Sequence, residues 1–122
     1  MPLNTSNIME NNTEVEKMKK HIIVEIVEYM PNAVVSRTII KKTSGNVTAT
    51  SFDSGEELGE KSIPFDTFVQ IIDGSAEVVL DGKKMKLNLG DGIIITANCK
   101  HSFIANEQFK MITTVIKSGY DL

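Results

Sequence analysis

The chain has 122 residues, with 13 lysines and arginines against 16 aspartates and glutamates, a formal net charge of −3 and no tryptophan. A chain of this length forms one domain and buries about two-thirds of its unfolded surface, so it needs no disulfide. The small negative charge, without a basic stripe, argues against nucleic acid or an anionic membrane as a partner. Cys99 is the single cysteine, and a lone thiol favours a reducing, cytoplasmic setting.

Residues 1–16 are dominated by Asn, Thr, Ser and Glu. This composition cannot offset the entropy of ordering, so we expect a disordered leader there and a single folded domain over residues 17–122. The apolar residues 21–30 are interrupted by Glu25 and Glu28, so they form neither a secretory signal nor a membrane span. We therefore expect a soluble protein.

Residues 14–30 fit two patterns. Met18, Ile22 and Ile26 would share one face of a helix, whereas Ile22, Val24 and Ile26 would also share one face of a strand. The segment is therefore predicted as a short N-terminal helix or an edge strand.

From residue 33 onwards, short runs rich in Val, Ile, Thr and Phe alternate with turn signals such as Asp73-Gly74 and Asp81-Gly82. The predicted strands are 33–41, 46–53, 67–73, 76–80, 83–88, 92–97, 101–105 and 109–116. Eight strands without a long helix between them predict an all-β fold, an antiparallel sandwich or barrel.

The last predicted strand is apolar on both faces, with Ile112 and Ile116 pointing outward. An outward apolar face is covered in a stable protein, here by the N-terminal segment or by another subunit. Residues 22–27, which could form a strand, and the unpaired edges of the sheet would also have to be covered. We therefore predict a homodimer in which each N-terminal segment lies along the partner's sheet.

Residues 90–103 contain a Gly-Asp turn, an apolar strand, a polar turn and then His101 at the start of the next strand. This order predicts a hairpin that carries one imidazole into the barrel. An inward histidine either hydrogen-bonds to the backbone without a further role, or anchors a ligand or transfers a proton.

The region 33–117 resembles the cupins, jelly-roll barrels with two motifs, G-x5-H-x-H-x3,4-E-x6-G and G-x5-P-x-G-x2-H-x3-N. Gly55 and Gly74 match the ends of the first motif, and Gly90 and His101 match the second. The resemblance, to small single-domain RmlC-like cupins of unassigned function, implies a double-stranded β-helix.

Cupin enzymes typically bind iron, manganese, nickel or zinc through three histidines and a glutamate. In the register of the resemblance, Lys61, Ile63 and Thr67 occupy three of these positions, and only His101 is retained. One imidazole holds a metal poorly, and the lysine ammonium has no free lone pair. We therefore expect no metal cofactor and name no catalytic residue.

An alternative keeps a metal. In this alternative the protein is a metal-dependent oxygenase or isomerase whose metal ligands are His101 and nearby carboxylates. The candidate carboxylates are Glu57, Glu60 and Asp66. A third interpretation is a dimeric structural or regulatory module.

The strand parity implied by the resemblance predicts a mostly apolar pocket with a few polar groups, the usual profile of a small-molecule site. Its predicted lining is Thr67, Val69, Ile71, Met85, His101 and Phe103. The favoured function is metal-free binding of a small molecule, with His101 as polar anchor and Thr67 as a second hydrogen-bonding group.

Three neighbouring features receive ordinary interpretations. Lys61 is predicted as a solvated loop charge paired with a nearby glutamate, in preference to a cavity residue that neutralises an anionic ligand. Glu56, Glu57 and Glu60 are predicted as a solvated acidic turn. Cys99 is predicted as a small buried apolar side chain, in preference to a nucleophile paired with His101.

Overall fold

The structure, a computed structural model, describes residues 7–119, which form ten strands and one short 3-10 helix. The all-β prediction is confirmed. The elements are β1 (Asn7–Asn11), η1 (Ile23–Glu25), β2 (Ala33–Lys42), β3 (Gly45–Phe52), β4 (Glu57–Lys61), β5 (Asp66–Gly74), β6 (Ala76–Leu80), β7 (Lys83–Leu87), β8 (Gly92–Ile95), β9 (His101–Ile104) and β10 (Phe109–Ile116).

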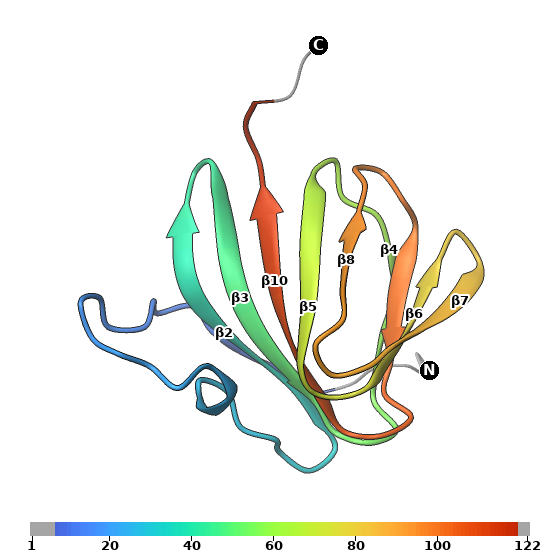
Figure 1. The fold of residues 1–122 in the computed structure, drawn as a ribbon, viewed down its shortest axis with the longest axis horizontal. Coiled ribbons are helices and arrows are strands. Elements are labelled where there is room, and N and C mark those ends of the chain that lie inside the picture. Colours follow the sequence, from blue (N-terminus) through green and yellow to red (C-terminus); the bar gives the residue numbers. More distant parts are fainter. Residues whose placement is uncertain (1–6, 120–122) are drawn as a thin grey trace.

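The strands form two sheets, a six-stranded one in the order β1-β2-β3-β10-β5-β8 and a four-stranded one in the order β4-β9-β6-β7. Every neighbouring pair is antiparallel except β1 and β2. The sheets come together at the lower end of Figure 1 and separate toward the upper end. This is the jelly-roll arrangement that the resemblance implied.

Gly74 makes one of the crossings between the sheets. It ends β5 in one sheet, and β6 begins two residues later in the other. Its φ is +67°, and a Cβ added to it would lie 2.0 Å from the carbonyl oxygen of Gln108. Only glycine fits both conditions, which explains the glycine at the end of the first motif.

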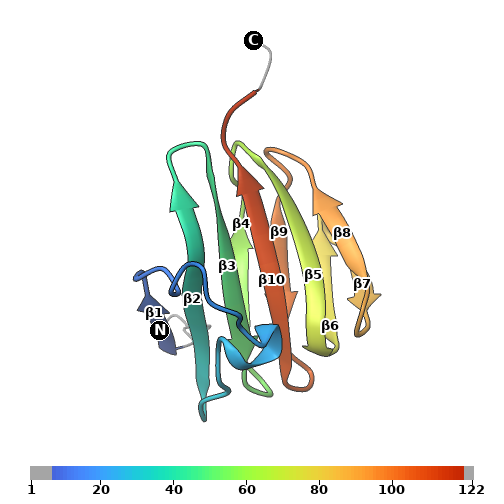
Figure 2. The same ribbon diagram turned by 60° about the vertical axis from the view of Figure 1, so that its left-hand side comes forward.

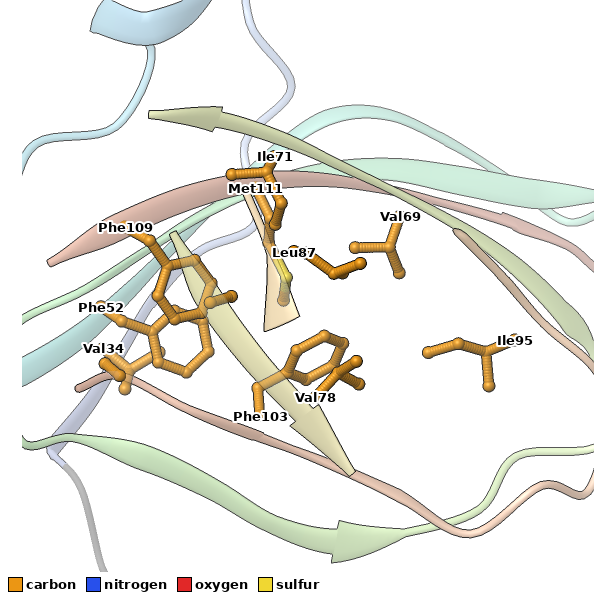
Figure 3. Packing of buried hydrophobic residues seen from close by; sticks show 12 residues of the cluster. Val34, Phe52, Val69, Ile71, Val78, Leu87, Ile95, Phe103, Phe109 and Met111 are labelled. Atoms are coloured by element: carbon orange, nitrogen blue, oxygen red, sulfur yellow. The ribbon is translucent and has the colours of Figure 1, made fainter. Parts of the chain in front are cut away.

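The core fills the end of the barrel where the sheets meet. The rings of Phe52 and Phe109 are stacked with centroids 4.3 Å apart, and both side chains are fully buried. Figure 3 shows them beside Val34, with Val69 and Ile95 at the other end of the cluster. Large side chains therefore close one end of the barrel and leave space toward the other.

The outer face of the six-stranded sheet carries a second apolar cluster, built on Val27, Ala49 and Ile112. The segment 12–32 lies over this face, with η1 in front of the lower part of the sheet (Figure 2). Ile112 is 7% exposed whereas Ile116 is 54% exposed. The N-terminal segment of the same chain thus covers Ile112, one of the two covers that the sequence suggested.

Several hydrogen bonds hold this segment on the sheet, and three of them come from residues 24–29. The Tyr29 hydroxyl donates to Asp73 Oδ2 over 2.6 Å, Ser51 Oγ donates to the Glu28 carbonyl over 2.7 Å, and Lys110 Nζ donates to the Val24 carbonyl over 2.7 Å. Lys110 also lies 4.8 Å from the centroid of the Tyr29 ring. The buried ammonium therefore has both a carbonyl and an aromatic partner.

Of the two alternatives predicted for residues 14–30, the structure has the short helix: η1 is a 3-10 helix of three residues, and no strand forms. The expectation of a disordered leader needs correction. Residues 7–11 of the expected disordered leader form β1, because they pair with the edge of β2. Residues 1–6 of that leader lie outside the described residues. No helix in the described part of the chain is long and apolar enough to cross a membrane.

Candidate functional site

A cavity of about 280 Å³ lies between the sheets, toward the end that the large core side chains leave open. Its lining comes from strands of both sheets and from the loop after β4. The lining residues are Ile8, Glu10, Val34, Ser36, Asn46, Thr48, Thr50, Leu58, Lys61, Ile63, Thr67, Val69, Ile95, His101, Phe103, Met111, Thr113 and Val115.

The four positions that the cupin resemblance assigns to metal ligands all line this cavity: Lys61, Ile63, Thr67 and His101. The register taken from the glycines is therefore supported by where these side chains lie. Only one of the four, the imidazole, is a usual metal ligand. The cavity therefore lacks the donor set that the resemblance implies for cupin enzymes.

A β-bulge places Lys61 at the cavity. Leu58 pairs with Phe103 and Lys61 pairs with His101, so three steps along β4 match two along β9. The extra residue lets both Leu58 and Lys61 line the cavity, although their odd separation would otherwise put them on opposite faces. The expectation that Lys61 is a loop charge is wrong.

Lys61 also lacks the predicted glutamate partner. Its ammonium makes no ion pair with any carboxylate of the described residues. The side chain is exposed at the rim of the cavity, next to His101 across the strand pair. Sequence reasoning missed this because a bulge has no reliable signal, although Gly59 within β4 was a hint.

His101 is 4% exposed, and its Nδ1 lies 3.0 Å from the carbonyl oxygen of Cys99. A carbonyl oxygen only accepts, so Nδ1 carries the hydrogen and the Nε2 of the neutral ring is an acceptor. No described residue donates to Nε2. The imidazole is thus held in one tautomer with an unused acceptor.

Thr67 is the first residue of β5 whose side chain lines the cavity. Its side chain is 6% exposed, and Oγ1 is buried without a hydrogen-bond partner in the described part of the protein. An unsatisfied buried hydroxyl costs about 1–3 kcal/mol. Such a group is unusual in a folded protein, and it gives the cavity a hydroxyl that a ligand can engage.

The cavity has a polar side and an apolar side. Hydroxyl and amide groups come from β2, β3 and β10: Ser36, Asn46, Thr48, Thr50 and Thr113. Apolar side chains come mainly from β5, β8 and β9: Val69, Ile95 and Phe103. Sequence reasoning missed the polar side, although the period-two spacing of Asn46, Thr48 and Thr50 was a signal for it.

Of the six residues predicted to line a pocket, four line this cavity: Thr67, Val69, His101 and Phe103. Ile71 faces inward but is 2% exposed within the core, on the closed side of the cavity. Met85 is 45% exposed and lies on β7, an edge strand. It lines a separate open depression of about 420 Å³ on the four-stranded sheet.

The carboxylates proposed as alternative metal ligands do not reach His101. Glu57, Glu60 and Asp66 do not line the cavity, and Asp66 Oδ1 accepts from the backbone N–H of Ala97 over 2.9 Å. Within residues 7–119, no group of three or more His, Cys, Asp or Glu side chains is placed to hold a metal ion. The residues at the cavity therefore do not fit the metal that cupin enzymes use.

The Cys99 thiol points away from the imidazole. Its Sγ lies 3.6 Å from Asp81 Oδ2, and the side chain packs against the core without lining the cavity. Burial, followed by the neighbouring Asp81 carboxylate, raises the pKa of the thiol. A thiol that resists ionisation is a poor nucleophile. Cys99 is half-buried, and its backbone carbonyl, not its side chain, contacts His101.

No family model matches the chain. The chain is 26% identical over 108 residues to "Polyketide synthase CurC" from Streptomyces cyaneus, covering 80% of this chain and 70% of that protein. The solved structure of the conserved SPY1581 protein of unknown function from Streptococcus pyogenes is 28% identical, with a TM-score of 0.82 over 89% of this chain and 96% of that one.

A cupin superfamily protein from Desulfitobacterium hafniense is 21% identical, with a TM-score of 0.80 over 88% of this chain and 99% of that chain. At this identity the likeness concerns the fold alone. The chain has the cupin jelly-roll fold, and the resemblance to small RmlC-like cupins is confirmed. Proteins of unknown function are among its similar structures.

Proposed function

We propose that this cupin-fold protein binds a small organic molecule in its barrel cavity without a metal ion, with His101 as the polar anchor. The observation that carries the proposal is the convergence of Lys61, Ile63, Thr67 and His101 on one cavity. The fold keeps the space in which cupin enzymes hold a metal and its substrate. The side chains there now offer hydrogen bonds and a positive charge instead of metal ligands.

The geometry of His101 suits an anchor. Its Nδ1–H is engaged by the Cys99 carbonyl, which fixes the ring and leaves Nε2 to accept from a ligand. Phe103 supports the ring in an edge-on arrangement with centroids 6.0 Å apart. A ligand that donates to Nε2 would therefore meet an acceptor that is already oriented, which reduces the entropy lost on binding.

The size of the cavity limits the ligand. Its volume of about 280 Å³ is at the lower end of small-molecule pockets. A compact molecule would fill it, with carbon atoms against Val69, Ile95 and Phe103 and polar atoms toward the hydroxyl groups of β3 and β10.

The proposal is tested by thermal-shift screening of metal-stripped protein against a library of small metabolites. A ligand at 100 times its dissociation constant adds about 2.7 kcal/mol to the stability. We expect some stabilisers whose effect disappears in His101→Ala and persists in His21→Ala. His21 is the matched control, because it lies in the N-terminal segment and bonds to the Glu16 carbonyl instead. Finding no stabiliser, or only stabilisers that act equally on both variants, would refute the proposal.

A further inference from the structure

We infer that the ligand is a hydroxylated carboxylic acid whose hydroxyl lies between His101 and Thr67 and whose carboxylate meets Lys61. This inference rests on the proposed function and names its ligand class. It is argued from three cavity-lining groups: His101 Nε2, which lacks a donor, Thr67 Oγ1, which lacks a hydrogen-bond partner, and the Lys61 ammonium, which lacks a carboxylate, each among the described residues.

The first two groups define a hydroxyl site. His101 Nε2 has a free lone pair and no donor, and Thr67 Oγ1 is buried with no partner among the described residues. A hydroxyl both donates and accepts. One ligand hydroxyl donating to Nε2 and accepting from Thr67 would satisfy both. An ether or a ketone offers only acceptors and would leave Nε2 unpaired.

The third group defines an anion site. Lys61 lies directly across the strand pair from His101, and side chains at such paired positions are neighbours. Its ammonium lines the rim without an ion pair in the described part of the chain. A carboxylate near the hydroxyl would therefore receive a charge-assisted hydrogen bond.

Glu10 is the other charged residue that lines the cavity. Among the described residues it makes no ion pair with Lys61, so no direct contact neutralises the ammonium next to the hydroxyl site. The positive charge beside His101 favours an acid over an amine at this end of the ligand.

The test compares matched molecules by calorimetric titration of the metal-stripped protein. The probes are 3-phenyllactate, its methyl ester, in which the carboxylate is capped and uncharged, and 3-phenylpropionate, which lacks the hydroxyl. The variants are Lys61→Met and Thr67→Val, which keep side-chain size. Lys86→Met is the control, because Lys86 is exposed on β7 outside the cavity.

We expect 3-phenyllactate to bind most tightly, with the ester and the deoxy acid each weaker by about 5- to 10-fold, since each loses about 1 kcal/mol. Lys61→Met should weaken the hydroxy acid and leave the ester unchanged. Thr67→Val should weaken the hydroxy acid and leave the deoxy acid unchanged, and Lys86→Met should change nothing.

Two results separate this inference from the proposal on which it rests. If the ester or the deoxy acid binds as tightly as 3-phenyllactate, still with loss of binding in His101→Ala, the ligand class is wrong and the binding cavity stands. If no member of the series and no library compound binds in a manner that depends on His101, both are overturned.

Discussion

At the scale of single residues, the hydroxyl of Thr67 is kept at a cost to stability. Oγ1 is buried and unpartnered in the described part of the protein, whereas the valine isostere would fit the same space without a polar group. Residues retained against stability commonly serve binding. The same substitution should therefore strengthen the fold and weaken the binding.

We predict that Thr67→Val raises the free energy of unfolding by about 1 kcal/mol in the absence of ligand, because the desolvation penalty of the hydroxyl disappears. Urea denaturation measures this change. Thr48→Val is the matched control: Thr48 lines the same cavity but is only half-buried, so its change should stay within about 0.5 kcal/mol. A destabilised Thr67→Val protein would show that Oγ1 has a partner.

Tyr29 makes the attachment of the N-terminal segment sensitive to alkali. Burial, followed by the hydrogen bond to Asp73, raises the pKa of its hydroxyl well above the ordinary value of 10.0. Because the folded protein holds this proton more tightly than the unfolded chain, its contribution is complete below pH 10.0 and declines as the pH rises further.

We therefore predict that the urea midpoint of the wild-type protein falls more steeply between about pH 10 and 11.5 than that of Tyr29→Phe. The phenylalanine variant keeps the ring over Lys110 and removes only the titrating group. Parallel curves for the two proteins would contradict the assigned role of the hydroxyl.

At the scale of elements, the two glycines of the first motif serve different purposes. Both have positive φ, +89° at Gly55 and +67° at Gly74, but an added Cβ meets nothing within 4 Å at Gly55 and a carbonyl oxygen at 2.0 Å at Gly74. Both alanine variants acquire backbone strain, and only one acquires a clash.

Gly74→Ala should therefore lower the free energy of unfolding by about 1–3 kcal/mol more than Gly55→Ala does, because only the alanine at position 74 clashes with a neighbouring carbonyl oxygen. Thermal and urea unfolding of the two variants provide the comparison. Equal losses would mean that the crossing between the sheets can move away from β10 without cost.

The sequence predicted those features that depend on short-range patterns. Alternation, turn glycines and the position of His101 were enough to predict the fold and the strands from residue 33 onwards, except β4. Lys61 was misplaced because residues 57–61, predicted as a polar loop, form β4, in which a bulge turns Lys61 toward the cavity. The position of the N-terminal segment on the sheet could not be predicted because it depends on distant partners such as Asp73, which no local pattern reveals.

At the scale of the whole molecule, one apolar patch of the six-stranded sheet lies beyond the N-terminal segment. Phe68 and Ile94 are paired across β5 and β8 and are 42% and 65% exposed, and Ile116 on β10 is 54% exposed. A stable dimer buries about 800 Å² on each partner. We propose this patch as the contact of a homodimer, since the chain itself already covers Ile112.

Light scattering at micromolar concentration should return twice the monomer mass of 13.5 kDa. Ile94→Glu should shift the protein toward the monomer, whereas Met85→Glu, a substitution at an exposed apolar residue of the other sheet, should not. A wild-type monomer would refute the dimer, and a dimer unaffected by Ile94→Glu would place the interface elsewhere.

The central claim is that His101 Nε2 accepts a hydrogen bond from an organic ligand instead of binding a metal. Nitrogen-15 NMR of the histidine side chains observes this atom directly, and His21→Ala assigns the signals of the two histidines. We predict that Nδ1 carries a hydrogen and that the Nε2 signal moves when 3-phenyllactate is added and does not move with one equivalent of Zn²⁺. An Nε2 signal that shifts on adding Zn²⁺ and stays shifted after gel filtration would contradict the account.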